Sequence, residues 1–400
     1  TAIVAVGSYG TTVQDVAFLK LDFTAAKEDI DVKSVQVDRL GLDVTDDDAF
    51  ASVSLWDGAT QLGSDRTLAN QGLSNSSTTF SLIAGSYWRI LAGQTKTLTI
   101  KADLAGTKTA DNKGTITGVT PKLCVINSAD AAGTNLAIET IGISSGNTIH
   151  AASTSDICGN YQVLHGSKPT LAAASLPSTT YGSGEKTLYR WTVTADSRGD
   201  IGWKRVVFDV SGSVSISSTI YTVGKGGTTS TDGVYMGSST DIQTNTIASA
   251  LIATSSLKIK NVATGVEVLP TTTDSGYYVW NYVAGGSRIG FTAKNEQVIG
   301  AGTTKTYELI GTLGYAGAAG DSVTTKIAKR STATSTAIYE DIVNTHWNYS
   351  VNDSIVTSTA PTFIWSDRSG SGATHTMGTS DWSLDYWISG LPTASLSLSR

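Results

Sequence analysis

Residues 90–101 read Ile-Leu-Ala-Gly-Gln-Thr-Lys-Thr-Leu-Thr-Ile-Lys. In the second half of this stretch the apolar residues Leu98 and Ile100 alternate with Thr97, Thr99 and Lys101. Such alternation directs one set of side chains into a core and the other into water, as a strand of an antiparallel sheet requires. The stretch therefore predicts a β-strand with one buried face.

The same alternation recurs along the chain, first at Leu19, Leu21 and Phe23. Clusters of Gly, Asn, Asp and Ser, such as 111–114 and 144–147, separate the apolar runs and predict turns. Windows with helical periodicity are scarce. Many short strands joined by turns predict an all-β fold of antiparallel, Ig-like β-sandwiches.

The opening stretch has a second copy. Residues 90–97 return at 299–306 as Ile-Gly-Ala-Gly-Thr-Thr-Lys-Thr. Upstream, a second block of matching residues pairs Phe23-Thr-Ala25, Asp29, Ile30 and Lys33 with Val193-Thr-Ala195, Asp200, Ile201 and Lys204. Two matches in the same order, in phase with the strand pattern, predict two related sandwiches. The second is longer, with a Gly/Ser/Thr-rich insertion around 211–250.

Proline residues suggest where the parts of the chain begin. Lys168-Pro169-Thr170 precedes the second copy, and Ala360-Pro361-Thr362 resembles it near the end of the chain. Proline at the first position of a strand removes no ladder hydrogen bond. We predict four parts: an N-terminal strand (1–15), a first sandwich (16–165), a second sandwich that repeats it (166–360) and an aromatic-rich C-terminal segment (361–400).

Composition excludes several classes of protein. Charged residues make up only 16% of the chain and the net charge is −6 without a basic run, which argues against a nucleic-acid partner. No uncharged apolar stretch reaches the length of a membrane span. The hydrophobic fraction of 40% argues against a disordered chain. Because the sequence begins at Thr1, we expect a mature chain from which an export signal was removed.

Cys124 and Cys158 are the two cysteines of the sequence. In an exported chain we favour a disulfide between them, which would stabilise the fold by roughly 3–4 kcal/mol, over two buried thiols. His150 and His165 flank Cys158, but there is no C-x-x-C pair of the kind that binds zinc. We therefore predict no metal site at these residues.

Candidate catalytic and metal-binding groups are few. The densest acidic run, Asp43 with Asp46, Asp47 and Asp48, could bind Ca²⁺, but it lacks the EF-hand spacing and we favour a solvated turn. Ser366, Asp367 and His375 lie outside any G-x-S-x-G motif. We predict that the chain is no enzyme and has no cofactor, with a concealed carboxylate pair as the alternative.

The two ends of the chain are candidates for assembly. Ile3, Val4 and Val6 belong to an apolar segment without charge before Asp15. This strand either completes its own domain or is donated to a neighbouring subunit, and both interpretations stay open. At the other end, four large aromatic residues predict a buried surface that packs on the second sandwich or on a neighbour: Trp365, Trp382, Tyr386 and Trp387.

Three blocks carry a resemblance to a known group of proteins: Ser167-Lys-Pro-Thr170, Thr194-Ala-Asp196, and Phe363-Ile-Trp-Ser-Asp367 with Asp381-Trp382 and Gly390-Leu-Pro392. They resemble large secreted, β-rich surface proteins of small-genome Patescibacteria. The resemblance spans 160–400 and, more weakly, the first copy. It implies an exported protein at the cell surface, and a natural carboxyl end near Arg400.

Together these features predict a self-assembling extracellular structural subunit whose partners are copies of itself. A pilus-like filament, polymerised through β-strand and head-to-tail contacts, is the first expectation. A surface layer is the alternative assembly. A monomeric adhesin or carbohydrate-binding surface protein, with a cell-surface glycan or a host cell as partner, is the alternative of another class.

Overall fold

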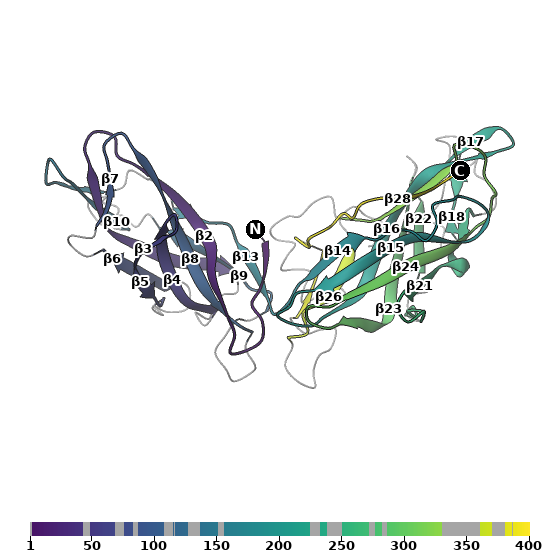
Figure 1. Ribbon diagram of the computed structural model, residues 1–400, viewed down its shortest axis with the longest axis horizontal. Helices are drawn as coiled ribbons and strands as arrows, with labels where there is room; N and C mark the ends of the chain where they lie inside the picture. The colour runs from purple at the N-terminus through teal and green to yellow at the C-terminus, as the bar shows by residue number, and fades with distance from the viewer. Residues whose placement is uncertain are drawn as a thin grey trace. The chain divides into compact units, whose positions relative to one another are not determined.

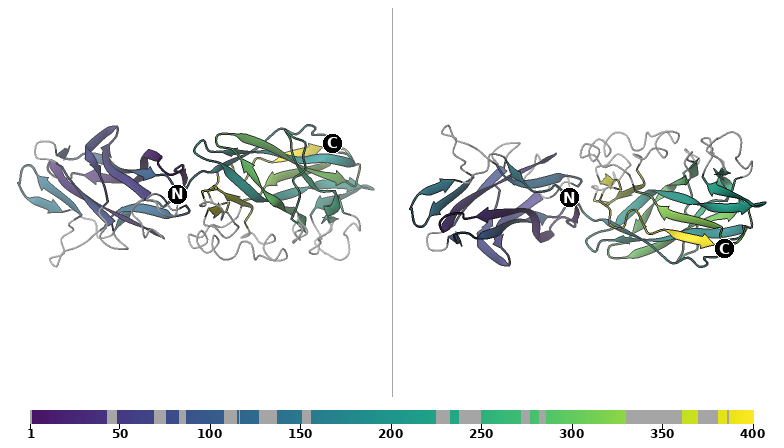
Figure 2. Two further views of the ribbon diagram at one scale, coloured as in Figure 1. Left: turned by 90° about the horizontal axis from the view of Figure 1, so that it is seen from below. Right: turned by 90° about the horizontal axis from the view of Figure 1, so that it is seen from above.

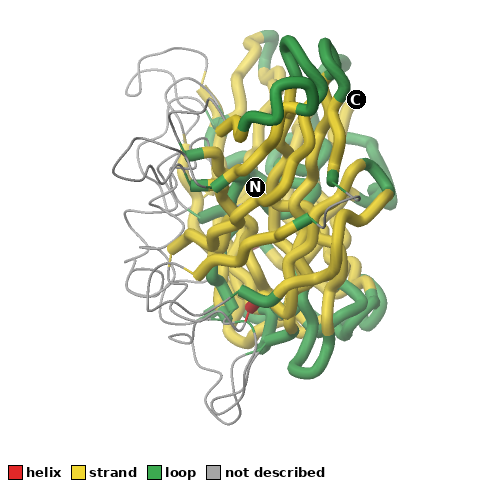
Figure 3. The backbone as a smooth tube through the Cα atoms, turned by 90° about the vertical axis from the view of Figure 1, so that its left-hand side faces the viewer, coloured by secondary structure: helices red, strands yellow, loops and turns green. Residues whose placement is uncertain are grey.

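The fold is all-β. A computed structural model describes residues 2–42, 49–68, 76–82, 87–107, 115, 117–126, 137–150, 156–224, 233–237, 250–271, 277–281, 286–329, 361–369, 381–385 and 387–400. These residues form strands and loops, with a short 3-10 helix, η2 (Thr254–Ser256) (Figure 3). They divide into two compact units, unit 1 (1–166) and unit 2 (167–400). Each unit is a β-sandwich built mainly from antiparallel sheets (Figures 1 and 2).

Unit 1 encloses its core between two sheets. Within the described residues, the first sheet has the order β2 (Thr12–Thr24), β8 (Thr95–Ala105), β4 (Phe50–Asp57) and β5 (Thr60–Arg66). The second has the order β11 (Thr148–His150), β10 (Ile138–Gly142), β3 (Ile30–Leu42), β9 (Thr120–Val125) and β12 (Ile157–Cys158), with β6 (Ser76–Ser81) and β7 (Trp88–Ile90) on β3. A parallel pair, β1 (Ala2–Ala5) and β13 (Gln162–His165), completes the described strands of the unit.

Unit 2 follows the same plan with more strands. Its first sheet has the described order β14 (Pro169–Ala173), β15 (Gly184–Ala195), β24 (Thr304–Leu313), β20 (Ile252–Ala253) and β18 (Gly233–Val234), with β21 (Lys258–Asn261) on β24. Its second has the described order β19 (Met236–Gly237), β17 (Thr219–Val223), β16 (Ile201–Ile216), β23 (Ser287–Ile299) and β22 (Tyr277–Asn281). The strands β25 (Ser322–Ile327) and β26 (Phe363–Ser366) join this second sheet beside β16, with β27 (Trp382–Ser383) on β26 and β28 (Leu396–Ser399) on β25.

The two sequence blocks that repeat form the same corner in both units. In unit 1, Thr24 of β2 pairs with Thr95 of β8, and their hydroxyl oxygens are 2.8 Å apart. In unit 2, Thr194 of β15 pairs with Thr304 of β24, with hydroxyl oxygens 2.7 Å apart. The repeated residues therefore fix one strand pair and its register in each sandwich.

An aspartate holds the turn at each of these corners. The Asp29 carboxylate accepts a hydrogen bond from the backbone N–H of Ala92 at 2.8 Å. The Asp200 carboxylate accepts the equivalent bond from Ala301, also at 2.8 Å. A carboxylate that accepts a backbone N–H satisfies a donor that the tight turn leaves without a ladder partner.

A glycine lets the long central strand bend in both units. Gly41 of β3 and Gly212 of β16 share a φ of 144°, a conformation that disfavours side chains. A Cβ atom on Gly41 would lie 2.5 Å from the Thr120 carbonyl oxygen, and one on Gly212 would lie 2.1 Å from that of Ser322. Both strands therefore need glycine where their backbones lie close to the paired strands β9 and β25.

The C-terminal segment forms the last strands of unit 2. Pro361 comes two residues before β26, which pairs with β16 from Val206 to Gly202. In unit 1, β10 occupies the corresponding place beside β3. At the end of the chain β28 pairs with β25. The residues after Pro361 thus complete a sheet of their own unit.

Candidate functional site

The predicted assembly strand lies against its own unit. Ile3 of β1 is opposite Val163 and Val4 is opposite Leu164, in parallel register. The Val6 N–H donates to the His165 carbonyl oxygen at 2.8 Å. Ile3 and Val6 are buried and Val4 is half-buried. The structure therefore shows the intramolecular arrangement of the two that the sequence left open.

Unit 2 has a counterpart to β1 at 179–181. Thr180 lies opposite Ser399 of β28 in parallel register, as Ile3 lies opposite Val163. The Tyr181 N–H donates to the Ser399 carbonyl oxygen at 3.0 Å, and the Ser399 N–H donates to that of Thr179 at 2.8 Å. In both units, the segment that precedes the first long strand thus pairs in parallel with the last strand of the unit.

Unit 2 also has a strand that the described part of unit 1 does not have. Strand β14 pairs antiparallel with β15 along its outer edge, with Leu171 opposite Val193. In unit 1 the counterpart of β15 is β2, which pairs with β8 on one side. Among the described residues, no strand pairs with the other side of β2. This outer edge of β2 is the candidate functional site of the chain.

The predicted C-terminal aromatic residues pack together inside unit 2. Trp365 is fully buried, and its indole N–H donates to the Leu384 carbonyl oxygen at 2.9 Å. Trp382 belongs to a buried cluster with Ile364 and Leu384, and Trp387 packs against that cluster. Tyr386 lies outside the described residues. Trp365 and Trp382 are therefore core residues of the unit that carries them, and Trp387 is partly buried against them.

Buried aspartates beside these tryptophans were not predicted. Asp381 accepts a hydrogen bond from the Ser366 hydroxyl at 2.7 Å, and Asp385 accepts one from Thr362 at 2.7 Å. Both carboxylates are at most 1% exposed. An aspartate embedded in an aromatic run is the sequence signal for such a polar contact, because an ionised side chain is buried only when it has partners.

Ser366 and Asp367, the weak catalytic candidates, are occupied by local contacts. The Ser366 hydroxyl donates to Asp381, and Asp367 accepts from the Ser369 hydroxyl at 2.6 Å. His375 lies outside the described residues. Within those residues, Ser366 therefore faces a carboxylate and not an imidazole that could act as its base.

Cys124 and Cys158 form a disulfide across 34 residues of sequence. Cys158 of β12 lies directly opposite Cys124 of β9 in the antiparallel register. His165, which was considered beside them, is buried with its Nδ1 atom 3.0 Å from the Thr117 hydroxyl. His165 thus sits in the core of unit 1 and has a polar neighbour of its own.

Two further expectations concern metal binding and membrane insertion. Asp43, Asp46, Asp47 and Asp48 lie outside the described residues, so the solvated turn that we favour there stays a prediction, with Ca²⁺ binding as its alternative. Within the described residues, no three His, Cys, Asp or Glu side chains gather as a metal site would require. In the same residues no helix is both long and apolar enough to cross a membrane.

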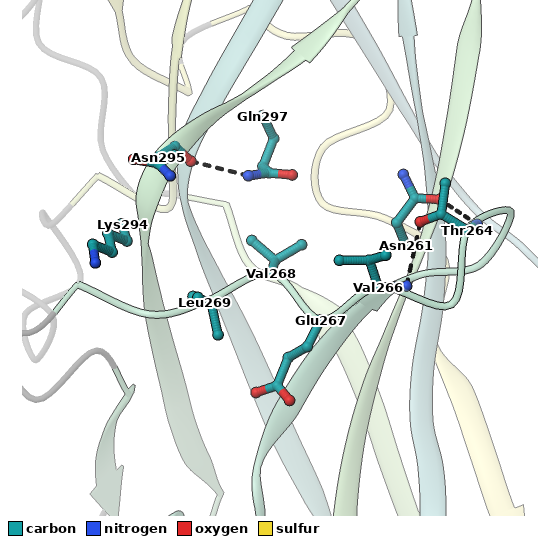
Figure 4. A pocket seen from close by; sticks show the side chains of 9 residues that line it. All are labelled: Asn261, Thr264, Val266, Glu267, Val268, Leu269, Lys294, Asn295 and Gln297. Atoms are coloured by element: carbon teal, nitrogen blue, oxygen red, sulfur yellow. Dashed lines mark hydrogen bonds between the residues drawn. The ribbon is translucent and has the colours of Figure 1, made fainter.

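A hollow of about 230 Å³ lies on unit 2 beside the β21 hairpin (Figure 4). Asn261 fixes the hairpin turn, because its side-chain oxygen accepts the N–H groups of Ala263 at 3.0 Å and Thr264 at 3.3 Å. The lining carries one carboxylate, Glu267, and one amine, Lys294. Glycoside hydrolysis uses a pair of carboxylates, which this hollow does not supply.

Burial shifts the pKa of tyrosines in the core of unit 2. Desolvation raises the pKa of Tyr189 to about 12, although hydrogen bonds from its neighbourhood oppose the shift. Desolvation likewise raises the pKa of Tyr307 to about 12. Both phenols are fully buried and therefore stay neutral at physiological pH. They act in packing, away from any opening where they could exchange protons with a substrate.

Comparisons with known proteins give distant likenesses. No family model matches the chain, and no curated protein matches it. Among solved structures, it is similar to the C-terminal domain of the Streptococcus agalactiae AgI/II polypeptide BspA, with 9% identity over 81% of this chain and 91% of that chain and a TM-score of 0.16. For the full-length major pilin RrgB from Streptococcus pneumoniae the identity is 11%, over 75% of this chain and 42% of that chain, with a TM-score of 0.17. We take no inference from TM-scores this low.

Proposed function

We propose that this chain is a self-assembling extracellular structural subunit, most simply of a pilus-like filament. The observation that carries the proposal is the difference between two sandwiches of one plan: β14 covers the edge of β15, and no described strand covers the edge of β2. An uncovered strand edge is a template for pairing with another chain. A second copy that supplies a strand to the edge of β2 would join one subunit to the next.

Three further features support an extracellular role. The disulfide between Cys124 and Cys158 is a bond that persists in oxidising compartments. The low charged fraction suits sheets that pack on one another. The motif resemblance to patescibacterial surface proteins implies the same location, which we include in the proposal.

A heterologous contact, in which one surface of a subunit meets a different surface of the next, generates an open filament when the rotation does not close. Pairing between the edge of β2 and a strand from elsewhere on a second copy is a contact of this kind. A surface layer would need such contacts in two directions. An adhesin would instead display grouped aromatic side chains at a loop tip.

The test is to purify the full chain with its disulfide intact, concentrate it and image it by negative-stain electron microscopy. Light scattering over a range of concentrations would give the mass of the particles. Fibres whose mass grows with concentration would support the filament, and a flat lattice would replace it with a surface layer. A particle that keeps the mass of one chain at every concentration would overturn the proposal.

A further inference from the structure

The second unit shows which residues a covering strand contacts at this edge. Pro169 of β14 lies opposite Ala195, Leu171 opposite Val193 and Ala173 opposite Trp191. Through the repeated block, these three residues of β15 correspond to Ala25, Phe23 and Leu21 of unit 1. The site on unit 1 therefore comprises the outer edge of β2 from Leu21 to Thr24, continued by Ala25.

Phe23 marks the place where a strand is missing. Its counterpart Val193 is 0% exposed, beneath a partner strand whose Leu171 is 1% exposed. Phe23 is only half-buried, although its ring packs edge-on against Trp88 with centroids 5.3 Å apart. A large aromatic side chain thus keeps apolar surface in water at the position where unit 2 places Leu171.

The open stretch of the β2 edge is bounded on its N-terminal side by Phe18. At Phe18 the backbone of another segment comes close, because a Cβ atom on Gly159 would lie 2.0 Å from the Phe18 carbonyl oxygen. Lys20 and Asp22 are exposed on this stretch of β2. Their counterparts Arg190 and Thr192 lie on the strand that β14 already covers.

We infer that the outer edge of β2 is an acceptor site for an extended strand of a second copy of this chain, in antiparallel register with an apolar residue opposite Phe23. The inference rests on the proposed function and names the contact through which subunits join. The strand it takes has the pattern of β14: buried Pro169 and Leu171 separated by exposed Thr170. A second copy is the donor because the proposed function joins copies of this chain, and its β14, which pairs with β15 in its own unit, would be exchanged from there to fill the edge.

The register of unit 2 permits a test in the full chain. Arg400 and Leu164 are equivalent positions, because each exchanges backbone hydrogen bonds with the turn before the neighbouring strand. Arg400 bonds with Gly320 and Asp321. Leu164 bonds with Gly118 and Val119 in the same pattern. Thr180 then corresponds to Ile3. Placing a copy of residues 168–177 directly before Thr1 therefore gives the added strand the spacing that β14 has in unit 2.

The matched control is the same extension with Leu171→Asp in the added copy, which puts a charge opposite Phe23. Hydrogen exchange of the dilute, monomeric proteins is measured by mass spectrometry on peptides that cover 19–25. We expect the apolar extension to slow exchange there by about tenfold or more relative to the control and to the unextended chain. Equal exchange in all three proteins would show that the edge accepts no strand and would overturn the inference.

The protein concentration needed for polymerisation tests whether a second copy donates the strand. Since the added strand occupies the edge in cis, we expect the extended chain to need about tenfold more protein to polymerise than the unextended chain, and the control to behave like the unextended chain. An extended chain that polymerises as readily as the unextended one would overturn the second copy as donor. An unextended chain that never polymerises would overturn the donor together with the proposed function, whereas slowed exchange in the extended chain would still establish the acceptor edge.

Discussion

At four aligned core positions unit 1 carries an aliphatic side chain where unit 2 carries an aromatic one: Leu21 and Trp191, Val32 and Trp203, Val37 and Phe208, Leu98 and Tyr307. In unit 2 these rings contact one another, with the centroids of Trp203 and Tyr307 5.1 Å apart and those of Trp191 and Phe208 5.2 Å apart. Aromatic pairs of this kind contribute about 0.5–1.5 kcal/mol each beyond the area they bury.

Unit 1 has a covalent link where unit 2 has none. Asp38 lies opposite Cys124, and its counterpart Asp209 lies opposite Lys326, so the disulfide position of β9 is a lysine in β25. One plan of strands is thus stabilised in two ways, by a cross-link over an aliphatic core and by a network of packed rings. The repeated corners therefore set the topology, whereas the core and the cross-link set the stability.

Among the substitutions, the largest expected effect comes from removing the disulfide. Replacing both cysteines, Cys124→Ser with Cys158→Ser, should destabilise unit 1 by roughly 3–4 kcal/mol, because the unfolded chain regains the entropy of the loop that the bond closes. Hydrogen exchange under mild denaturant, followed separately on peptides of each unit, measures the change. Unit 2 has no described cysteine and serves as the internal control. An equal loss of stability in both units would contradict the conclusion that the disulfide stabilises unit 1.

The next effect is an alkaline weakness that is larger in unit 2 than in unit 1. Tyr189 and Tyr307 have pKa values of about 12 in the folded chain, above the ordinary value of 10. The folded state therefore binds more protons than the unfolded state between these values, so stability is lost as the pH rises through this window. The loss should approach about 2–3 kcal/mol for each tyrosine near pH 12.

The counterparts of these tyrosines in unit 1 are Leu19 and Leu98, which do not ionise. Urea unfolding at a series of pH values above about 9, followed by exchange on each unit, separates the two responses. Tyr189→Phe should remove about a quarter of the alkaline loss, because burial also raises the pKa values of Tyr181, Tyr277 and Tyr307. The change has a cost near neutral pH because the Tyr189 hydroxyl donates to the Ala394 carbonyl oxygen at 2.8 Å. An equal alkaline loss in the two units would refute the explanation.

The repeated corners could be predicted from sequence because all of their determinants are local. The matched threonines, aspartates and alternating apolar residues lie within short blocks, and the structure places them in the same strand pair in each unit. The all-β fold follows from the same alternation and is confirmed. The bond between Cys124 and Cys158 could be proposed because the sequence holds only two cysteines.

The open edge and the buried aspartates could not be predicted in this way. Whether β2 has an outer partner depends on a strand that belongs to another part of the chain or to another chain, and no residue of β2 encodes it. The apolar pattern of Ile3 and Val6 fits a donated strand as well as the parallel pairing with β13 that the structure shows. Asp381 and Asp385 are tolerated in the core through Ser366 and Thr362, which are contacts that exist only after folding.

The smallest effect tests how alike the two corners are. Asp29→Ala and Asp200→Ala each remove the acceptor of one backbone N–H, with the same length of 2.8 Å in both units. We expect each change to destabilise its own unit by about 1 kcal/mol, the usual net value of such a bond. Asn in either position keeps an acceptor oxygen and should recover part of the loss. Urea unfolding followed by hydrogen exchange measures the loss of unfolding free energy in each unit. If the two losses differed several-fold, the corners would have the same geometry but different energetics. The aliphatic core of unit 1 and the aromatic core of unit 2 would then have to account for the difference.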